Sequence, residues 1–250
     1  MFTRIKTPNE IEAMRTSGKM LASILKKIKH EAVVGATGKD IAQFVRGELK
    51  ALDAKASFLG QYGFPDVICI SVNDEVVHGV PNNTPFKKGD LVSFDFGVTF
   101  NGMITDSAFT MAIEGTDDKE AQRLLKTTEE SLYAGINQVH NGVRVGDIAS
   151  AVQKVLEHQH LGVVRDLVGH GVGHQVHEDP NIPNYGVSGT GVALKEGMTI
   201  AIEPMATLGS YQVKPGTDNW AIRTADGSLS AHFEHTVLIT AKGAEILTAL

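Results

Sequence analysis

The sequence predicts an α+β fold in which a unit of two helices followed by strands occurs twice. Two pairs of segments with helix-period apolar residues are each followed by short β-branched runs. A faint internal repeat supports this division, because Gly35–Ala42 (GATGKDIA) resembles Gly142–Ala149 (GVRVGDIA). Each copy connects a longer predicted helix to a shorter one, although chance similarity over so few residues is an alternative explanation. We expect one domain over residues 1–250, with halves at about 1–115 and 116–250.

The helices have recognisable start signals and apolar faces. Thr7-Pro8-Asn9-Glu10 fits a capping box with proline at the first helical position, and the apolar residues that follow predict a helix over about 8–29. A second helix is predicted over about 39–52. The next stretch, to about residue 65, has no clear period and is predicted to be a loop. The second pair of helices is predicted over about 118–139 and 146–158.

The strands are predicted from β-branched runs and one strong turn signal. Leu91–Phe100 and Met103–Ala112 flank Asn101-Gly102, a dipeptide that favours a two-residue hairpin turn. The sequence also predicts further strands at about 67–72, 163–168, 198–202, 221–224 and 232–240.

Composition argues against several classes of protein. The hydrophobic share of 42% and charged share of 21% are ordinary for a soluble globular chain. Its one cysteine, Cys69, allows no intrachain disulfide, and the N-terminal MFTRIKTPNEIEAMR lacks the apolar core of a secretory signal. We therefore expect a cytoplasmic protein. No run reaches the roughly 18 apolar residues of a membrane span, and the net charge of −6 argues against dedicated nucleic-acid binding.

Two aspartates interrupt the apolar pattern of the predicted hairpin. If Asn101-Gly102 forms a two-residue turn, Asp106 faces Gly97, and Asp95, two residues before Gly97, projects from the same face of the sheet. Two like charges on a buried face repel each other, and a divalent cation between them removes that cost. The pair therefore indicates a metal site. The alternative is two solvated aspartates on an exposed face.

Further candidate ligands lie in the second half of the chain. The segment VGHGVGHQVHEDP contains His170, His174 and His177 among glycines, which argue against a helical zinc pair of the first two. A polar loop with structural histidines is the alternative. Glu203 and Glu234 lie in strand-like runs. Four acidic strand residues and one histidine suit two metal ions that share a bridging water or hydroxide.

The order of several motifs resembles that of methionine aminopeptidase, type I. The motifs are NDEVVHGVP from Asn73, FDF from Phe94, TDS from Thr105, GHGVG from Gly169, HEDP from His177, IEPM from Ile202 and FEHT from Phe233. The resemblance begins near Ile5 and covers nearly the whole chain. It implies the pseudo-twofold pita-bread fold with a central curved antiparallel sheet. It also implies removal of N-terminal methionine from nascent proteins that have a small second residue.

The resemblance also implies the metal ligands and the groups that perform the chemistry. The ligands of two divalent ions (cobalt, manganese, iron, zinc or nickel) would be Asp95, Asp106, His170, Glu203 and Glu234. Glu203 would also act as general base, so that a bridging hydroxide attacks the methionyl carbonyl. His177 would stabilise the oxyanion and His78 would contact the scissile nitrogen. His174 has no assigned role. The partners would be nascent polypeptides at the ribosome, and the protein would be a monomer.

The expected methionine pocket is where this sequence departs from the family. The candidate lining residues are Phe58, Tyr62, Phe64, Cys69 and Trp220, and a plain packing role is the alternative for Trp220. Many bacterial relatives have cysteine at the position of Phe58 and tyrosine at that of Gln61, and Gly97 and Val176 also replace larger family residues. These departures affect the expected shape of the pocket and leave the predicted reaction class unchanged.

Two other functions fit the same resemblance. An X-Pro aminopeptidase or prolidase shares the fold, but such enzymes usually carry an additional N-terminal domain, whereas this chain begins almost directly at the expected catalytic unit. A non-catalytic binding protein of the same fold has typically lost metal ligands, and all five candidates are present here. Metal content and peptide preference separate the three functions.

Overall fold

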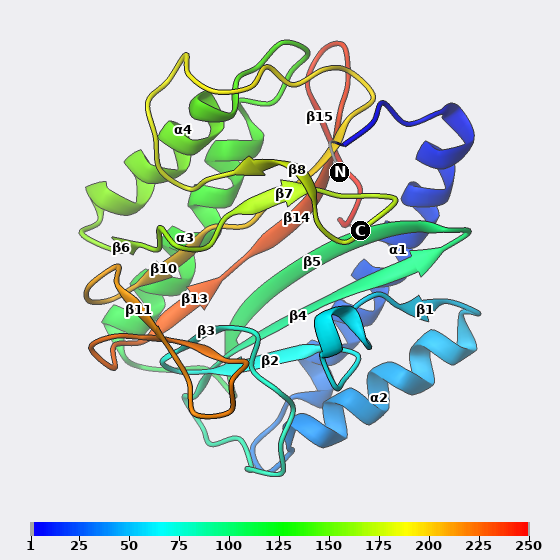
Figure 1. The fold of residues 1–250 in the computed structure, drawn as a ribbon. Helices are drawn as coiled ribbons and strands as arrows, with labels where there is room; N and C mark the ends of the chain where they lie inside the picture. The colour runs from blue at the N-terminus through cyan, green and yellow to red at the C-terminus, as the bar shows by residue number, and fades with distance from the viewer. Residues whose placement is uncertain (1–2, 250) are drawn as a thin grey trace.

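An antiparallel sheet of nine strands forms the middle of the computed structural model, which describes residues 3–249. Residues 1, 2 and 250 of the predicted single domain lie outside this range. The strands of the sheet are β1 (Lys55–Ala56), β2 (Cys69–Val72), β4 (Leu91–Phe100), β5 (Met103–Ala112), β7 (Gly169–Gly171), β8 (Glu178–Ile182), β9 (Thr199–Ile202), β14 (Glu234–Ile239) and β15 (Ala244–Ile246). Their order is β1-β4-β5-β14-β9-β7-β8, with β2 paired to β4 and β15 to β14 (Figure 1).

Two smaller sheets of three strands each flank the large one. One contains β13 (Ser230–His232), β10 (Met205–Thr207) and β6 (Gly162–Val163), in that order. The other contains β11 (Val213–Pro215), β12 (Ile222–Thr224) and β3 (Glu75–Val77), in that order.

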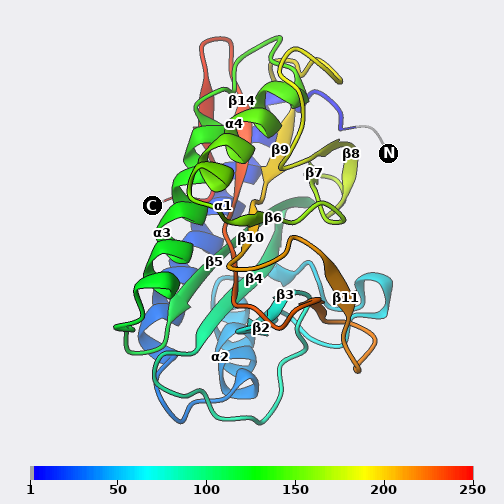
Figure 2. The ribbon, with the colours of Figure 1, turned by 90° about the vertical axis from the view of Figure 1, so that its left-hand side faces the viewer.

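Four helices cover one side of the large sheet in the described part of the chain. They are α1 (Pro8–Glu31), α2 (Gly38–Ala51), α3 (Lys119–Ile136) and α4 (Val145–His158). Figure 2 shows all four on one side of the molecule, with β3, β7, β8 and β11 on the other. The predicted helices are confirmed, with ends within three residues of the expected limits. No helix of residues 3–249 is long and apolar enough to cross a membrane.

The capping signals read from the sequence are present in the structure. The Thr7 hydroxyl accepts the Glu10 N–H, and the Glu10 carboxylate accepts the Thr7 N–H at 2.7 Å. The internal repeat also has one local structure in both copies. Asp40 accepts the N–H of Thr37 at 2.9 Å, and Asp147 accepts the N–H of Arg144 at 3.0 Å. Both aspartates therefore stabilise the start of the second helix of their pair.

The hairpin of β4 and β5 has the predicted limits and register. Gly97 pairs with Asp106 and Asp95 with Ala108, so the two aspartates share one face. The turn residues Asn101 (φ 48°) and Gly102 (φ 76°) both have left-handed backbone conformations, as a type I′ turn requires.

Most of the differences between the predicted elements and those in the structure concern short strands. The predicted loop after α2 contains β1 and a 3-10 turn at Gln61–Gly63, and only Val163 of the run expected at 163–168 lies in a strand. The strands β3, β7, β8, β10, β11, β13 and β15 were not predicted, and each has three to five residues. Such segments are too short to show alternation, and β7 has the sequence Gly-His-Gly. Pairing with neighbouring strands, rather than intrinsic propensity, therefore determines their conformation.

The N-terminal segment is fixed to the sheet by a buried ion pair. Lys6 Nζ lies 3.1 Å from Glu178 Oε2, and both side chains are almost fully buried. The other oxygen of Glu178 accepts the N–H groups of His174 and Gln175. The Lys6 N–H donates to the Gly197 carbonyl. The pair thus connects the segment before α1 to the turn between β7 and β8.

Replacing Lys6 by methionine would leave the Glu178 carboxylate buried without its cationic partner. We expect Lys6→Met to lower the free energy of unfolding by about 3 kcal/mol or more in urea denaturation. The control is Lys27→Met, which removes a pair with Glu48 whose lysine side chain is half exposed. That loss is expected to stay below about 1 kcal/mol. Equal, small losses in both variants would contradict a structural role for the buried pair.

Candidate metal centre and substrate pocket

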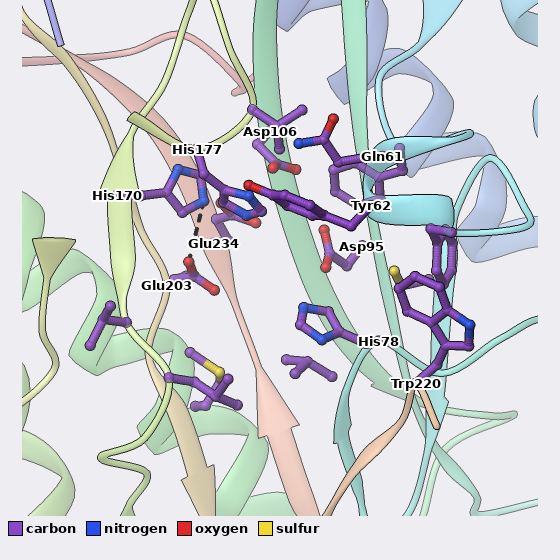
Figure 3. A pocket seen from close by; sticks show the side chains of 18 of the residues that line it. Gln61, Tyr62, His78, Asp95, Asp106, His170, His177, Glu203, Trp220 and Glu234 are labelled. Atoms are coloured by element: carbon purple, nitrogen blue, oxygen red, sulfur yellow. Dashed lines mark ion pairs between the residues drawn. The ribbon is translucent and has the colours of Figure 1, made fainter. Parts of the chain in front are cut away.

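One cavity of about 330 Å³ brings together every residue that the sequence predicted for the site. The predicted residues that line it are Phe58, Tyr62, Phe64, Cys69, His78, Asp95, Asp106, His170, His177, Glu203, Trp220 and Glu234. Figure 3 shows the acidic residues and His170 converging around the middle of the cavity, with Trp220 on the far side of Asp95 from His170. The site therefore has a polar, acidic part and an apolar part.

The five candidate metal ligands come from five different strands or strand ends. Asp95 lies in β4, Asp106 in β5 and His170 in β7, whereas Glu203 follows β9 and Glu234 begins β14. These strands are neighbours in the large sheet, so residues far apart in sequence meet on its surface. Ligand atoms of Asp106, His170 and Glu234 all lie within 4.8 Å of one another. This spacing suits a shared metal ion.

His170 is oriented so that one ring nitrogen is available. Its Nδ1–H donates to the Gly171 carbonyl at 2.9 Å, which leaves Nε2 without a proton in the neutral ring. That Nε2 points at Glu203, whose Oε1 lies 3.5 Å away, as the dashed line in Figure 3 marks. A backbone acceptor on the other nitrogen is the usual support for a metal-binding histidine.

Three of the acidic residues each have a buried oxygen without a hydrogen-bond partner in the part of the chain that the structure covers. Asp95 Oδ1, Asp106 Oδ1 and Glu234 Oε1 are buried and have no hydrogen-bond partner among the described residues. Burial raises the pKa of Asp106 and of Glu203 to about 8. Burial, reinforced by the charge of Asp106, raises the pKa of Asp95 and of Glu234 well above their usual range. A divalent cation would supply the missing partner and keep these groups ionised, so the residues fit a metal.

Two further histidines lie beside the acidic cluster and are kept neutral. His78 follows β3 in a left-handed conformation (φ 61°), and its burial lowers its pKa to about 4. His177 precedes β8, and burial lowers its pKa as well. The rings of His177 and His170 meet edge to face, with centroids 4.5 Å apart. Neutral imidazoles at these places can each donate one hydrogen bond into the cavity.

The apolar part of the cavity is built from aromatic rings. The Phe64 and Trp220 rings meet edge to face with centroids 5.2 Å apart, and Phe58 and Cys69 are also buried. Tyr62 differs from these residues because it is 79% exposed and its ring stacks on His177, with centroids 6.1 Å apart. Tyr62 therefore lies at the mouth of the cavity, beside the catalytic candidates, as Figure 3 shows.

The loop that carries Phe58, Tyr62 and Phe64 is anchored to α2 by Asp66. This buried carboxylate accepts hydrogen bonds from Lys39 and from Arg46, each at 2.8 Å, and from the Val67 N–H at 2.9 Å. The anchor keeps the apolar wall of the cavity in place against the sheet.

Sequence reasoning missed His232 and left His174 without a role. The Nε2 atom of the buried His232 lies 3.3 Å from Glu203 Oε2, so this residue contacts a candidate ligand. Its position two residues before Glu234 in a strand-like run was an available signal. His174 does not reach the ligand cluster, because its Nε2–H donates to Glu10 Oε1 at 2.7 Å and its backbone N–H to Glu178. It supports the turn that precedes His177.

Comparison with known proteins places the fold and the site in a family. The model of metallopeptidase family M24 matches residues 12–241. This chain belongs to that family. It is 44% identical to the methionine aminopeptidase of Clostridium perfringens, over 98% of each chain, and 44% identical to methionine aminopeptidase 1 of Bacillus subtilis, over 97% of this chain and 98% of that one. The resemblance to methionine aminopeptidases and the prediction of an enzyme are confirmed.

Solved structures give the same result for the fold. The crystal structure of methionine aminopeptidase from Thermotoga maritima superposes with a TM-score of 0.97 at 45% identity, over the full length of both chains. Prolidase from Pyrococcus furiosus superposes with a TM-score of 0.78 over 98% of this chain and 65% of that one, at 24% identity. The latter likeness shows the fold alone. The predicted pita-bread fold is confirmed, and the proline-specific alternatives are not favoured.

The raised carboxyl pKa values predict how pH affects the metal-free protein. A carboxyl group whose pKa is higher in the folded chain than in the unfolded chain binds its proton more tightly in the folded state. The stability that this proton contributes is present at low pH and is lost as the pH rises through the folded pKa. For Asp106 and Glu203 the folded pKa is about 8. In EDTA, the free energy of unfolding is therefore expected to fall by more than about 1 kcal/mol between about pH 7.5 and pH 8.5, a range in which most histidines of the unfolded chain are already neutral.

Saturating Mn²⁺ should remove this loss, because loaded carboxylates carry no proton in the folded state. Asp106→Asn should reduce the loss in EDTA, since it deletes one of the titrating groups. Urea denaturation at each pH measures both effects. The same pH dependence with EDTA and with Mn²⁺ would show that the acidic residues do not share a cation.

Proposed function

We propose that this protein removes the N-terminal methionine from polypeptides by a hydrolysis that depends on two divalent metal ions. The observation that carries the proposal is the convergence of four carboxylates, three buried and that of Glu203 largely buried, and His170 on a cavity whose opposite part is aromatic. The names of the relatives support the same activity. We further propose that the substrates are nascent chains with a small second residue, met in the cytoplasm at the ribosome, and that the protein acts as a monomer.

The metal ions would be held by Asp95, Asp106, His170, Glu203 and Glu234. Carboxylate and imidazole ligands accept manganese, iron, cobalt, nickel or zinc, and the supply of each metal selects among them. When bound, such ions activate a water molecule and polarise the substrate carbonyl. The protein's part is to hold the ligands on neighbouring strands of a rigid sheet.

Glu203 is the residue that we propose as general base. Its carboxylate lines the cavity beside the other candidate ligands, so it could take a proton from a water held at the metal site. Its contact with His170 supports this assignment, because His170 is itself a candidate ligand. A carboxylate in this place could receive a proton during attack and release it to the leaving amine.

His177 and His78 would act on the substrate's peptide group. Both are neutral at pH 7 because burial lowers the pKa of each, so each can donate an N–H hydrogen bond without adding charge. We assign His177 to the developing oxyanion, since its ring lies beside the ligand His170. We assign His78 to the scissile nitrogen, because it lines the cavity near Asp95, away from His170 (Figure 3).

The methionine side chain would occupy the aromatic part of the cavity. Phe58, Phe64 and Trp220 offer ring edges and faces, with which a thioether makes favourable contacts. Cys69 adds a small apolar wall and stays protonated, because burial raises the pKa of its thiol. Tyr62, at the mouth, would instead contact the second residue of the substrate or its backbone.

Release of methionine from Met-Ala-Ser tests the activity directly. Protein stripped of metal and supplied with Mn²⁺ or Co²⁺ is expected to cleave Met-Ala-Ser and to leave Ala-Pro-Ala intact. Amino-acid analysis of the products measures both reactions. Preference for Ala-Pro-Ala would show an X-Pro peptidase, and inactivity with every divalent ion would favour a binding protein.

Two substitutions test the proposed roles of Glu203 as base and of His177 as oxyanion donor. Glu203→Gln is expected to lower kcat by about 100-fold or more, because both the proton acceptor and a charged metal ligand are lost. His177→Ala is expected to lower kcat by about 100-fold while KM changes little, since the lost hydrogen bond forms mainly in the transition state. Circular dichroism checks that both variants remain folded. Full activity in Glu203→Gln would exclude the assigned mechanism.

A further inference from the structure

We propose that His232 is a positioning residue that orients the Glu203 carboxylate by donating a hydrogen bond to it. The proposal rests on the proposed function of Glu203 as metal ligand and base. His232 lies outside the set of five candidate ligands, and its contact with Glu203 is the feature that connects it to the site.

The backbone of His232 is held rigidly in place. The Thr110 hydroxyl accepts the His232 N–H and donates to the His232 carbonyl, both at 2.8 Å. Thr110 is itself held by Ser93, whose hydroxyl lies 2.8 Å from that of Thr110. His232 is therefore fixed to both strands of the hairpin that carries Asp95 and Asp106.

The segment around Glu203 is fixed to the same region from the other side. His232 pairs with Met205 across β13 and β10, and the Phe233 N–H donates to the Pro204 carbonyl at 3.3 Å. The Glu203 carbonyl accepts a hydrogen bond from the buried Asn184 side chain at 3.0 Å. With both backbones fixed, the orientation of the Glu203 carboxylate depends on the torsions of its side chain.

The carboxylate lies between two imidazole rings. Oε1 is 3.5 Å from His170 Nε2 and Oε2 is 3.3 Å from His232 Nε2. The His232 ring is 1% exposed, and within residues 3–249 neither of its nitrogens has an aligned hydrogen-bond partner. A buried N–H without a partner is costly, so a small rotation that aligns Nε2–H with Oε2 is favoured.

A neutral imidazole suits this position better than a cation. The neutral ring has one N–H, which is enough for one hydrogen bond to Glu203, and it carries no charge. It can fix the orientation of the carboxylate without competing with a metal ion for its charge. Each carboxylate oxygen has two acceptor sites, so Oε2 can accept from His232 while Oε1 faces the metal site beside His170.

The test compares a variant that keeps a donor with one that removes it. His232→Gln retains an N–H donor of similar reach, and His232→Leu fills a similar volume without one. We expect the glutamine variant to stay within about threefold of the native kcat. The leucine variant should lose about tenfold or more in kcat on Met-Ala-Ser, with KM nearly unchanged, as supporting residues around metal ligands typically do.

Metal affinity is a readout that does not depend on turnover. Calorimetric titration of metal-free protein with Mn²⁺ alone is expected to show binding weakened about tenfold in His232→Leu and nearly native binding in His232→Gln. The matched control is His235→Leu, which removes a partly buried histidine, hydrogen-bonded to Thr248 and outside the cavity lining. It should leave Mn²⁺ affinity unchanged.

Each result distinguishes the role of His232 from the proposed function. Native kcat and Mn²⁺ affinity in His232→Leu would overturn the positioning role. Equal losses in the glutamine and leucine variants would also overturn it, because a direct metal ligand or a packing role would then explain the residue. Failure of the native protein to release methionine would refute the proposed function, while the Mn²⁺ titration would still test His232.

Discussion

Mutual repulsion among four carboxylates that face one cavity is the constraint on which the rest of this structure depends. Asp95, Asp106, Glu203 and Glu234 face one cavity, and three of them have an oxygen without any hydrogen-bond partner among the described residues. Such a cluster is unfavourable unless a cation or protons neutralise it. The fold therefore has to hold the residues together against their repulsion, and the strongly paired sheet provides that rigidity.

Hydrogen bonds and an ion pair restrict the movement of the residues around this cluster. Gly171 fixes the tautomer of His170, and the Lys6–Glu178 pair supports the turn that leads to His177. Asp66 anchors the aromatic loop to a helix. Each of these supports is buried or partly buried and comes from a different part of the chain. Residues that stabilise the fold therefore also support the site, as the contact between the N-terminal segment and the turn that leads to His177 illustrates.

The sequence predicted features that depend on local chemistry and missed those created by tertiary pairing. The capping box at Thr7 and the register of the Asn101-Gly102 turn are local, so the shared face of Asp95 and Asp106 followed from the sequence alone. Motif resemblance supplied the other ligands. The short strand that carries His170 has no strand propensity, and its conformation comes from pairing with β8 and β9. The contact of His232 with Glu203 needs two separate strands to meet, so the place of His232 near Glu234 in the sequence could indicate the residue but not this contact.

A crystal structure of the protein grown with Mn²⁺, with anomalous scattering data at the manganese edge, would test whether the carboxylate cluster and His170 hold two metal ions. We expect two anomalous peaks at the large sheet, which between them lie within bonding distance of all five candidate ligands: Asp95, Asp106, His170, Glu203 and Glu234. Peaks bound elsewhere, or carboxylates that turn away from one another with no ion between them, would contradict it.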